Sequence, residues 1–259
     1  MIFSRRNVLA ITAAGAAANA LIGPSKSVAA SASTIKAVAF DGFPILDPRP
    51  VLATGKQMYP ENGDSFVSLF QTRLFEYQWL RALGGRYKDF LSIIDDAHIF
   101  AAAQLGGEAT HEKRARLRDA FLKIKAWPDA ANALHALKSK GLRLAFLSNM
   151  TADMLNMGLA NSGLEGLLDH VLSTDAIKTF KPDPRAYQLG IGAFKLPKEQ
   201  IAFAAFAGWD AAGAEWFGYP TFWVNRLGAK FEGLDAQKTA TGQGLSDLVR
   251  FIDEYNKQG

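Results

Sequence analysis

The order of hydrophobic patterns along the chain restricts its fold more than any other feature. Residues 35–40 form a short β-rich apolar run that ends at Asp41, and residues 48 to about 125 have a helical pattern throughout. From residue 127 onward, helical and strand-like patterns alternate. Such alternation predicts an α/β fold with a doubly wound, parallel, Rossmann-like sheet. The helical block then interrupts this sheet after its first strand.

The helical block predicts a cap domain inserted into the α/β core. Apolar residues recur there at spacings of three and four, which gives one helical face: Phe66, Leu69, Phe70, Arg73, Leu74, Tyr77 and Leu80. Gly84-Gly85 ends that helix, and two more helical patterns cover residues 87–105 and 111–124. We therefore expect a helical-bundle cap over residues 48–125 and a core made of residues 33–47 and 126–259.

The second half of the chain predicts the remaining strands of the sheet. A helix that starts at Pro128 is expected to run to Lys140, where Gly141 stops it. Strands are expected at residues 142–147, 171–173, 201–205 and 221–224. Ligands of open parallel sheets bind at the carboxyl ends of the strands. A cap inserted directly after the first strand would cover that edge.

The first 32 residues have the pattern of an export signal. Ser4-Arg5-Arg6-Asn7-Val8-Leu9 is a twin-arginine pattern, and a modestly apolar run follows at residues 8–22. Small residues then offer cleavage points near Ala30 or Ala32. An amphipathic helix or a retained anchor is the alternative, but the run is short and rich in Ala and Gly for a membrane span. We expect a cleaved Tat signal, a periplasmic protein and no membrane association after cleavage.

Charge and composition exclude several classes of function. Residues 1–32 hold three of the 29 basic residues and none of the 25 acidic ones, which leaves 26 basic against 25 acidic residues in the body. Without a basic patch, we expect no binding of nucleic acid. The chain has no cysteine, so thiolate nucleophiles and cysteine metal sites are excluded. Its four histidines show no metal-ligand spacing, and no glycine-rich phosphate loop is present.

Polar residues follow three of the expected strands and would meet at one edge of the sheet. Asp41 follows the first strand, Ser148-Asn149 the second, and Asp210 a later one, while Lys181 lies in a loop between strands. Alone, Asp41 could simply cap a turn. Beside a lysine, a carboxylate is held in the ionised form that a nucleophile requires. Asp210 could orient the lysine, and Ser148-Asn149 could hold a substrate carboxylate.

These segments occur in the motif order of the haloacid dehalogenase superfamily. Four segments carry the resemblance: Phe40-Asp41-Gly42-Phe43, Leu147-Ser148-Asn149, Lys181-Pro182-Asp183 and Trp209-Asp210-Ala211-Ala212-Gly213-Ala214. Three longer stretches, at residues 75–87, 181–187 and 217–226, resemble the L-2-haloacid dehalogenase branch, also called type II or (S)-2-haloacid dehalogenases. The similarity extends from residue 35 to the last helix.

The resemblance implies a two-step hydrolysis of a short 2-haloacid, without metal or cofactor. Asp41 would displace halide from the α-carbon with inversion, and water activated near Lys181 and Asp210 would hydrolyse the resulting ester to a 2-hydroxyacid. Seven residues would contact the carboxylic acid substrate: Gly42, Phe43, Gln71, Ser148, Asn149, Tyr187 and Trp209. The only partner implied is this small molecule, and the resemblance allows a homodimer.

The chain departs from the branch at several polar positions. Gln71 stands where the family has a halide-contacting arginine, and Arg73 points about 200° away from it on a helix. Pro44 and Ile45 replace a glycine and a threonine, and a serine and an asparagine before Trp209-Asp210 are Ala205 and Ala207. A charged donor to the departing halide is worth about 2–3 kcal/mol in a dry site. We expect weakened activity or an altered substrate.

Two alternatives share the predicted fold. A superfamily phosphatase would keep the covalent chemistry, but it uses acidic residues at the positions of Phe43 and Phe206, where magnesium needs oxygen ligands. A catalytically reduced homologue that binds a small carboxylate would explain the changes at Gln71, Ala205 and Ala207. Halide release distinguishes the dehalogenase from both alternatives.

Overall fold

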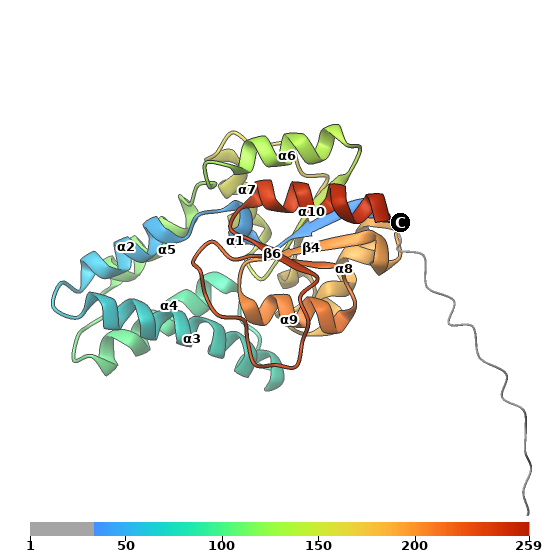
Figure 1. Ribbon diagram of the computed structural model, residues 1–259. Coiled ribbons are helices and arrows are strands. Elements are labelled where there is room, and N and C mark those ends of the chain that lie inside the picture. Colours follow the sequence, from blue (N-terminus) through green and yellow to red (C-terminus); the bar gives the residue numbers. More distant parts are fainter. Residues whose placement is uncertain (1–33, 259) are drawn as a thin grey trace, which may run out of the picture. The chain divides into compact units, whose positions relative to one another are not determined.

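The core of the protein is a six-stranded parallel sheet with the strand order β3-β2-β1-β4-β5-β6 (Figure 1). The computed structural model describes residues 34–258. The strands are β1 (Ala37–Phe40), β2 (Arg143–Ser148), β3 (His170–Ser173), β4 (Ile201–Ala205), β5 (Thr221–Val224) and β6 (Ala240–Gly242). Strand β1 lies in the middle and pairs with β2 on one side and β4 on the other. This arrangement confirms the predicted α/β doubly wound fold.

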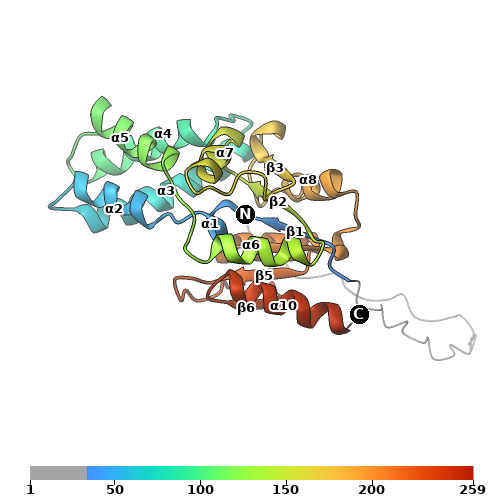
Figure 2. The ribbon, with the colours of Figure 1, turned by 90° about the horizontal axis from the view of Figure 1, so that it is seen from above.

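Helices cover both faces of the sheet (Figures 1 and 2). On one face lie α6 (Ala130–Ser139) and α10 (Leu245–Gln258), which contact each other, and on the other face lie α8 (Pro184–Phe194) and α9 (Gly208–Phe217). Successive residues of a strand point to opposite faces. Accordingly, Val38 and Phe40 pack in the first core, whereas Ala37 and Ala39 pack in the second.

Four helices form the cap between β1 and α6: α2 (Arg49–Met58), α3 (Gly63–Leu83), α4 (Phe90–Gln104) and α5 (His111–Leu122). The chain leaves the core and returns to it along adjacent segments, because Leu46 and Ala126 form an antiparallel bridge. Asp47 N–H donates to the Lys125 carbonyl at 2.8 Å, and Trp127 N–H donates to that of Ile45 at 2.9 Å. These bonds hold the two connections of the cap together.

Helix boundaries follow local capping more closely than apolar spacing. The helix expected from residue 87 begins at Phe90, because the Asp89 side chain accepts the N–H of Ser92 at 2.7 Å and caps it. The helix expected from Pro128 begins at Ala130.

The apolar face predicted for α3 was wrong at the C-terminal end of the helix. Leu80 is 62% exposed, and Gln78 instead of Leu80 continues the row of buried residues.

Several short elements complete the described part of the chain. They are α1 (Gly42–Ile45), α7 (Ala152–Ala160) and the 3-10 turns η1 (Thr174–Ile177) and η2 (Lys198–Gln200). Strand β6 was missed, because its three residues Ala-Thr-Gly carry no apolar alternation. The expected Tat signal lies outside the described residues. No helix among residues 34–258 is long and apolar enough to cross a membrane.

Candidate active site

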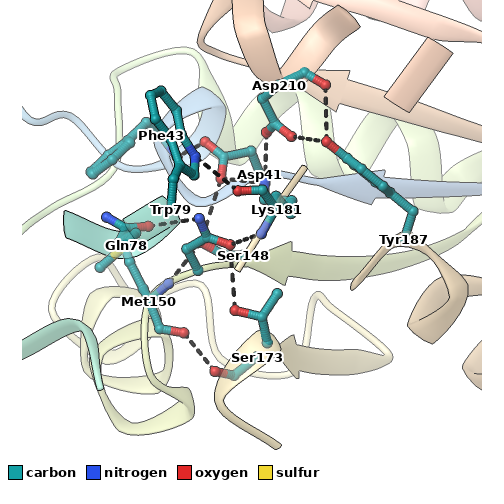
Figure 3. Close-up of polar contacts among 12 residues, drawn as sticks. Asp41, Phe43, Gln78, Trp79, Ser148, Met150, Ser173, Lys181, Tyr187 and Asp210 are labelled. Atoms are coloured by element: carbon teal, nitrogen blue, oxygen red, sulfur yellow. Dashed lines mark hydrogen bonds and ion pairs between the residues drawn. The ribbon is translucent and has the colours of Figure 1, made fainter. Parts of the chain in front are cut away.

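Asp41, Lys181 and Asp210 form one buried charged group at the carboxyl edge of the sheet (Figure 3). Lys181 Nζ lies 2.9 Å from Asp41 Oδ1 and 2.6 Å from Asp210 Oδ2. Asp41 directly follows β1, and Asp210 lies in the first turn of α9, where the helix dipole favours a negative charge. The three residues predicted to carry the chemistry are therefore in direct contact.

Burial gives this group unusual electrostatics. Asp210 is 1% exposed and Lys181 is fully buried. Burial raises the pKa of Asp210 to about 6, opposed by attraction to Lys181 and reinforced by repulsion from Asp41. Burial alone would lower the pKa of Lys181, but Asp210 and Asp41 together raise it above its usual value. One ammonium group thus serves two carboxylates, and Lys181 stays protonated at neutral pH.

Asp41 also caps the short helix α1. Its Oδ2 accepts the N–H of Phe43 at 3.2 Å, while its Oδ1 faces Lys181 and lies 3.4 Å from the Ser148 hydroxyl. The capping role considered from the sequence and the position beside Lys181 therefore coexist. Gly42 begins α1, and a Cβ there would lie 3.0 Å from Met150 Sδ and 3.1 Å from Ser148 Oγ. Gly42 is therefore closely packed here, and its predicted contact with substrate stays a prediction.

Tyr187, which was predicted to contact substrate, bonds Asp210 from the second core. Its side chain is fully buried on α8, and it does not line the cavity. The hydroxyl donates to Asp210 Oδ1 at 2.8 Å (Figure 3), and burial raises its pKa well above the usual value. Because the apolar ring packs against Phe203 in the second core, only the hydroxyl reaches the charged group. Tyr187 therefore positions Asp210 from behind.

Asn149 connects the end of β2 to the lysine loop. Its Oδ1 accepts the backbone N–H of Lys181 at 2.8 Å and the Thr174 hydroxyl at 3.3 Å. Its Nδ2 donates to Gln78 Oε1 at 2.7 Å. Asn149 and Ser148 both line the cavity, but the Asn149 amide is engaged within the protein. Ser148 Oγ is the better placed of the two for a substrate, since it lies beside Asp41.

Gln78 and Trp79 on α3 are site residues that the sequence did not reveal. Gln78 is completely buried and bonds Asn149, while Trp79 Nε1 donates to the Lys181 carbonyl at 3.2 Å (Figure 3). Two consecutive cap residues thus hold the loop that carries the lysine. A buried glutamine in an otherwise apolar row was the signal available in the sequence, because buried amides are nearly always bonded.

A cavity of about 220 Å³ opens beside Asp41 between cap and core. Of the residues predicted to contact substrate, Phe43, Gln71 and Trp209 line it together with Ser148 and Asn149. Eight of the 23 lining residues are Phe or Trp, so the wall favours apolar ligands. Within that wall, polar side chains come mainly from the core.

Two of the positions at which the chain departs from the family pattern lie on this wall. Gln71 and Ala207 line the cavity, whereas Arg73 does not, because it pairs with Glu76 and stacks over Phe100. No side chain therefore takes the place of the missing arginine on α3.

The acidic positions of the phosphatases are filled by aromatic rings. Phe43 and Phe206 pack edge to face with centroids 5.9 Å apart. Among residues 34–258, no cluster of three or more His, Cys, Asp or Glu side chains could hold a metal ion. Two rings where magnesium requires oxygen ligands do not fit that metal.

Arg226 is a further cavity residue that the sequence reasoning missed. It is the one basic residue on the described cavity wall, and its side chain is 8% exposed. Its Nη2 lies 2.8 Å from Asp129 Oδ1 and donates to the Pro44 carbonyl at 2.9 Å, and its guanidinium lies over the Trp127 ring. Its charge is therefore balanced by Asp129, and it ties the loop after β5 to α1.

Comparison with known proteins agrees with this geometry. The family model of the haloacid dehalogenase-like hydrolases matches residues 14–218. The chain belongs to this family. Among characterised members, it is 34% identical over 219 residues to the (S)-2-haloacid dehalogenase of Pseudomonas putida, covering 84% of this chain and 96% of the relative. It is 36% identical over 199 residues to that of Pseudomonas sp. strain YL, covering 76% and 86%.

Solved structures of the family have the same fold. A crystal structure of an L-2-haloacid dehalogenase superposes with a TM-score of 0.83 at 37% identity, covering 85% of this chain and all of that one. The enzyme of Xanthobacter autotrophicus with chloropropionic acid covalently bound superposes with a TM-score of 0.78 at 30% identity, covering 85% and 99%. The predicted membership of this hydrolase family is therefore confirmed.

Proposed function

We propose that the protein hydrolyses the carbon–halogen bond of an (S)-2-haloacid through an ester on Asp41. The observation that carries this proposal is Lys181 Nζ, which lies between Asp41 and Asp210 within 2.9 Å of both. The Asp41 carboxylate faces the cavity and contacts Lys181 behind it, as an attacking carboxylate requires. Relatives of more than 30% identity are (S)-2-haloacid dehalogenases, which supports the same chemistry.

In the first step, Asp41 Oδ2 attacks the α-carbon of the acid. A carbon–oxygen bond forms, and the electron pair of the carbon–halogen bond leaves with the halide, which inverts the carbon. Asp41 Oδ1 becomes the carbonyl oxygen of the ester and keeps its contact with Lys181. Ser148 Oγ, 3.4 Å from Oδ1, is placed to donate to the substrate carboxylate when the acid lies against Asp41.

In the second step, a water molecule attacks the ester carbonyl carbon of Asp41. Lys181 stabilises the negative charge that develops on Oδ1. Asp210 accepts the proton of the water, which suits a carboxylate whose pKa is raised to about 6. The carbon–oxygen bond of the ester breaks, the 2-hydroxyacid takes up a proton, and Asp41 is regenerated. The net reaction consumes water and releases a 2-hydroxyacid, a halide ion and a proton.

The test is halide release from L-2-chloropropionate by the chain without residues 1–32. We expect release by the wild type and none by Asp41→Asn, which keeps the shape of the side chain but removes its charge. A brief exposure to substrate followed by acid quenching should leave the acyl ester on the peptide that contains Asp41. Equal rates from the two proteins would overturn the proposal.

The second candidate is binding of a small carboxylate without turnover. The apolar replacements Ala205 and Ala207 and the uncharged Gln71 favour it, because they remove polar contacts to water and halide. This candidate predicts a higher melting temperature with 2-hydroxyacids and no halide release from any 2-haloacid. The two candidates are thus separated by the same assay.

We also propose that the protein is exported through the Tat pathway and acts in the periplasm. The twin-arginine pattern of Arg5 and Arg6, followed by an apolar run and small residues, supports this proposal. Cell fractionation should recover the wild-type protein with periplasmic markers, shortened near Ala30 or Ala32. Arg5→Lys combined with Arg6→Lys should keep it inside the cell, and periplasmic recovery of this variant would contradict Tat export.

A further inference from the structure

The cavity beside Asp41 is bounded on its outer side by the cap. All four cap helices contribute to its wall, among them Leu52 of α2, Leu74 of α3, Phe90 of α4 and Phe121 of α5. The space therefore lies between the charged group at the sheet edge and the helical bundle.

The part of the wall that the cap contributes is aromatic. Phe70, Phe90 and Phe121 are each at most 2% exposed, and the Phe121 ring centroid lies 6.4 Å from that of Phe70 and 6.0 Å from that of Phe90. On α3, Phe70 precedes Gln78 by eight residues, which corresponds to about 12 Å along a helix axis. Since Gln78 bonds Asn149 at the sheet edge, Phe70 lies about two helical turns along α3 from that contact, next to Gln71.

Most polar side chains of the wall come from the core. They are Asp41, Ser148, Asn149, Asn225 and Arg226, and Gln71, next to Phe70, is the one polar lining residue from the four described cap helices. Water in the aromatic part would find few hydrogen-bond partners, whereas an apolar group would fill it favourably. The cavity is thus divided into an ionic end and an apolar end.

The volume is sufficient for a ring as well as an acid. An apolar cavity of roughly 150 Å³ accommodates benzene. The cavity here measures about 220 Å³, which leaves space at the ionic end for the carbon atoms that react. A three-carbon acid would leave half-buried apolar residues of the wall, such as Leu52, Phe75 and Trp209, without a ligand group to contact.

We propose that the substrate is a 2-haloacid whose side chain is bulky and apolar, with an aryl group as the best fit. This inference rests on the proposed function, because it assigns the leaving halide and the carboxylate to the ionic end near Asp41 and Ser148. The side chain then lies against the aromatic wall, where the half-buried rings of Phe75 and Trp209 offer surface and aromatic groups gain from edge-to-face contact. A compound of this class is 2-bromo-3-phenylpropionate.

The test compares acids of increasing side-chain size under identical conditions. We expect kcat/KM for halide release to rise at least tenfold from (S)-2-bromopropionate to (S)-2-bromo-3-phenylpropionate. Calorimetric titration of the wild type with the corresponding products should show 3-phenyllactate binding at least tenfold more tightly than lactate. Halide release from the short acid alone, with lactate bound as tightly as phenyllactate, would overturn this inference and leave the proposed function standing.

Absence of halide release from every acid would overturn the proposed function instead. Tighter binding of 3-phenyllactate in that case would still support aryl-acid specificity of the cavity. Equal binding of the two hydroxyacids would overturn that specificity as well. The two failures are therefore distinguishable.

A matched pair of variants on α2 locates the ring. Leu52 lines the cavity and is half-buried, whereas the neighbouring Ala53 is exposed and lies outside the wall. Leu52→Trp should lower kcat/KM for the phenyl substrate at least tenfold more than that for 2-bromopropionate. Ala53→Trp should change neither. Equal losses on both substrates with Leu52→Trp in a folded protein would contradict the placement of the ring against the cap.

Discussion

The charged group at the sheet edge and the cavity wall around it differ in how far they follow the family pattern. Asp41, Lys181 and Asp210 are all present and in contact at 2.6 and 2.9 Å. On the wall, by contrast, lie Gln71 and Ala207, at positions where the resemblance to the family leads us to expect an arginine and an asparagine. The first region determines which bond can be broken, and the second determines which molecule is held there.

The difference has a physical basis. Each member of the charged group depends on the others, because removal of one leaves a buried charge without its partner. Gln71 and Ala207 carry no charge, so that a change at either position leaves no buried charge without a partner. On the two proposals above, the chain keeps the reaction of its family and differs in the substrate that it recognises. The variants below alter each region in turn.

Lys181→Met should have the largest effect, because it removes the one cation that two buried carboxylates share. We expect halide release to fall about 10³-fold or more, since Lys181 stabilises the developing oxyanion. The free energy of unfolding should fall by about 3–5 kcal/mol, the usual cost of breaking a buried ion pair. Halide assays and denaturant titration measure the two losses. Lys178→Met, at a side chain that is 64% exposed, is the control, and equal losses in both variants would contradict the assignment.

The raised pKa of Asp210 predicts that activity and stability respond to pH with opposite signs. Its folded pKa of about 6 lies above its usual 3.8, so the native state binds this proton more readily than the unfolded chain. The contribution of Asp210 to stability therefore grows as the pH falls from about 6 towards 4. Protonated Asp210 cannot accept the proton of the attacking water, so that kcat/KM should fall about tenfold per pH unit below about 6.

Rate profiles and melting temperatures measured between pH 5 and 7 test this prediction. Carboxylates with lowered pKa, such as Asp169 and Asp183, also stabilise the fold. Their contribution to the free energy of unfolding is lost only at lower pH, below the pKa that they have in the unfolded chain. The melting temperature should thus hold or rise where the rate declines. Asp210→Asn should have low activity at every pH and should not show the decline in rate below pH 6. A parallel loss of rate and melting temperature would indicate acid unfolding and contradict the role of Asp210.

Most of the fold and the centre of the site were predictable from the sequence. The apolar run before Asp41 is a buried strand because helices cover both faces of the sheet. All four residues of β1 are therefore buried, alternately in one core and the other. The strands at residues 201–205 and 221–224 occur with the predicted bounds. Lys181 and Asp210 could be placed beside Asp41, since parallel strands bring their carboxyl ends to one edge.

The rest depended on tertiary contacts without a local signature. Tyr187 was predicted to contact substrate, yet its hydroxyl is directed from α8 towards Asp210. Gln78 lies 71 positions from its partner Asn149, and Arg226 lies 97 positions from Asp129. No spacing rule relates residues at such separations. Strand β6 was missed because it is a three-residue edge strand whose pairing with β5 defines it.

Gln71→Arg sharpens the comparison by restoring a cation to the changed wall. A charged donor to the departing halide contributes about 1.5–3 kcal/mol, so that kcat for 2-chloropropionate should rise about tenfold or more. Thr72→Arg places the same charge at the neighbouring exposed position of α3 and is the control. Halide assays on both variants measure the effect. An unchanged rate with Gln71→Arg would mean that the lack of a charged donor at position 71 does not limit halide release.

Gln78→Met should have the smallest effect, because it changes the support of the site and none of its reacting atoms. The substitution keeps the length of the side chain but removes Oε1, which leaves Asn149 Nδ2 buried without its acceptor. We expect a loss of about 1–3 kcal/mol in the free energy of unfolding. Because Asn149 still accepts the N–H of Lys181, halide release should fall only severalfold, in kcat rather than in KM. Leu80→Met, at an exposed position of the same helix, should change neither quantity. A rise in KM with kcat unchanged would instead make Gln78 a determinant of substrate binding. The region that recognises substrate would then include the end of α3 that contacts Asn149 and the Lys181 loop.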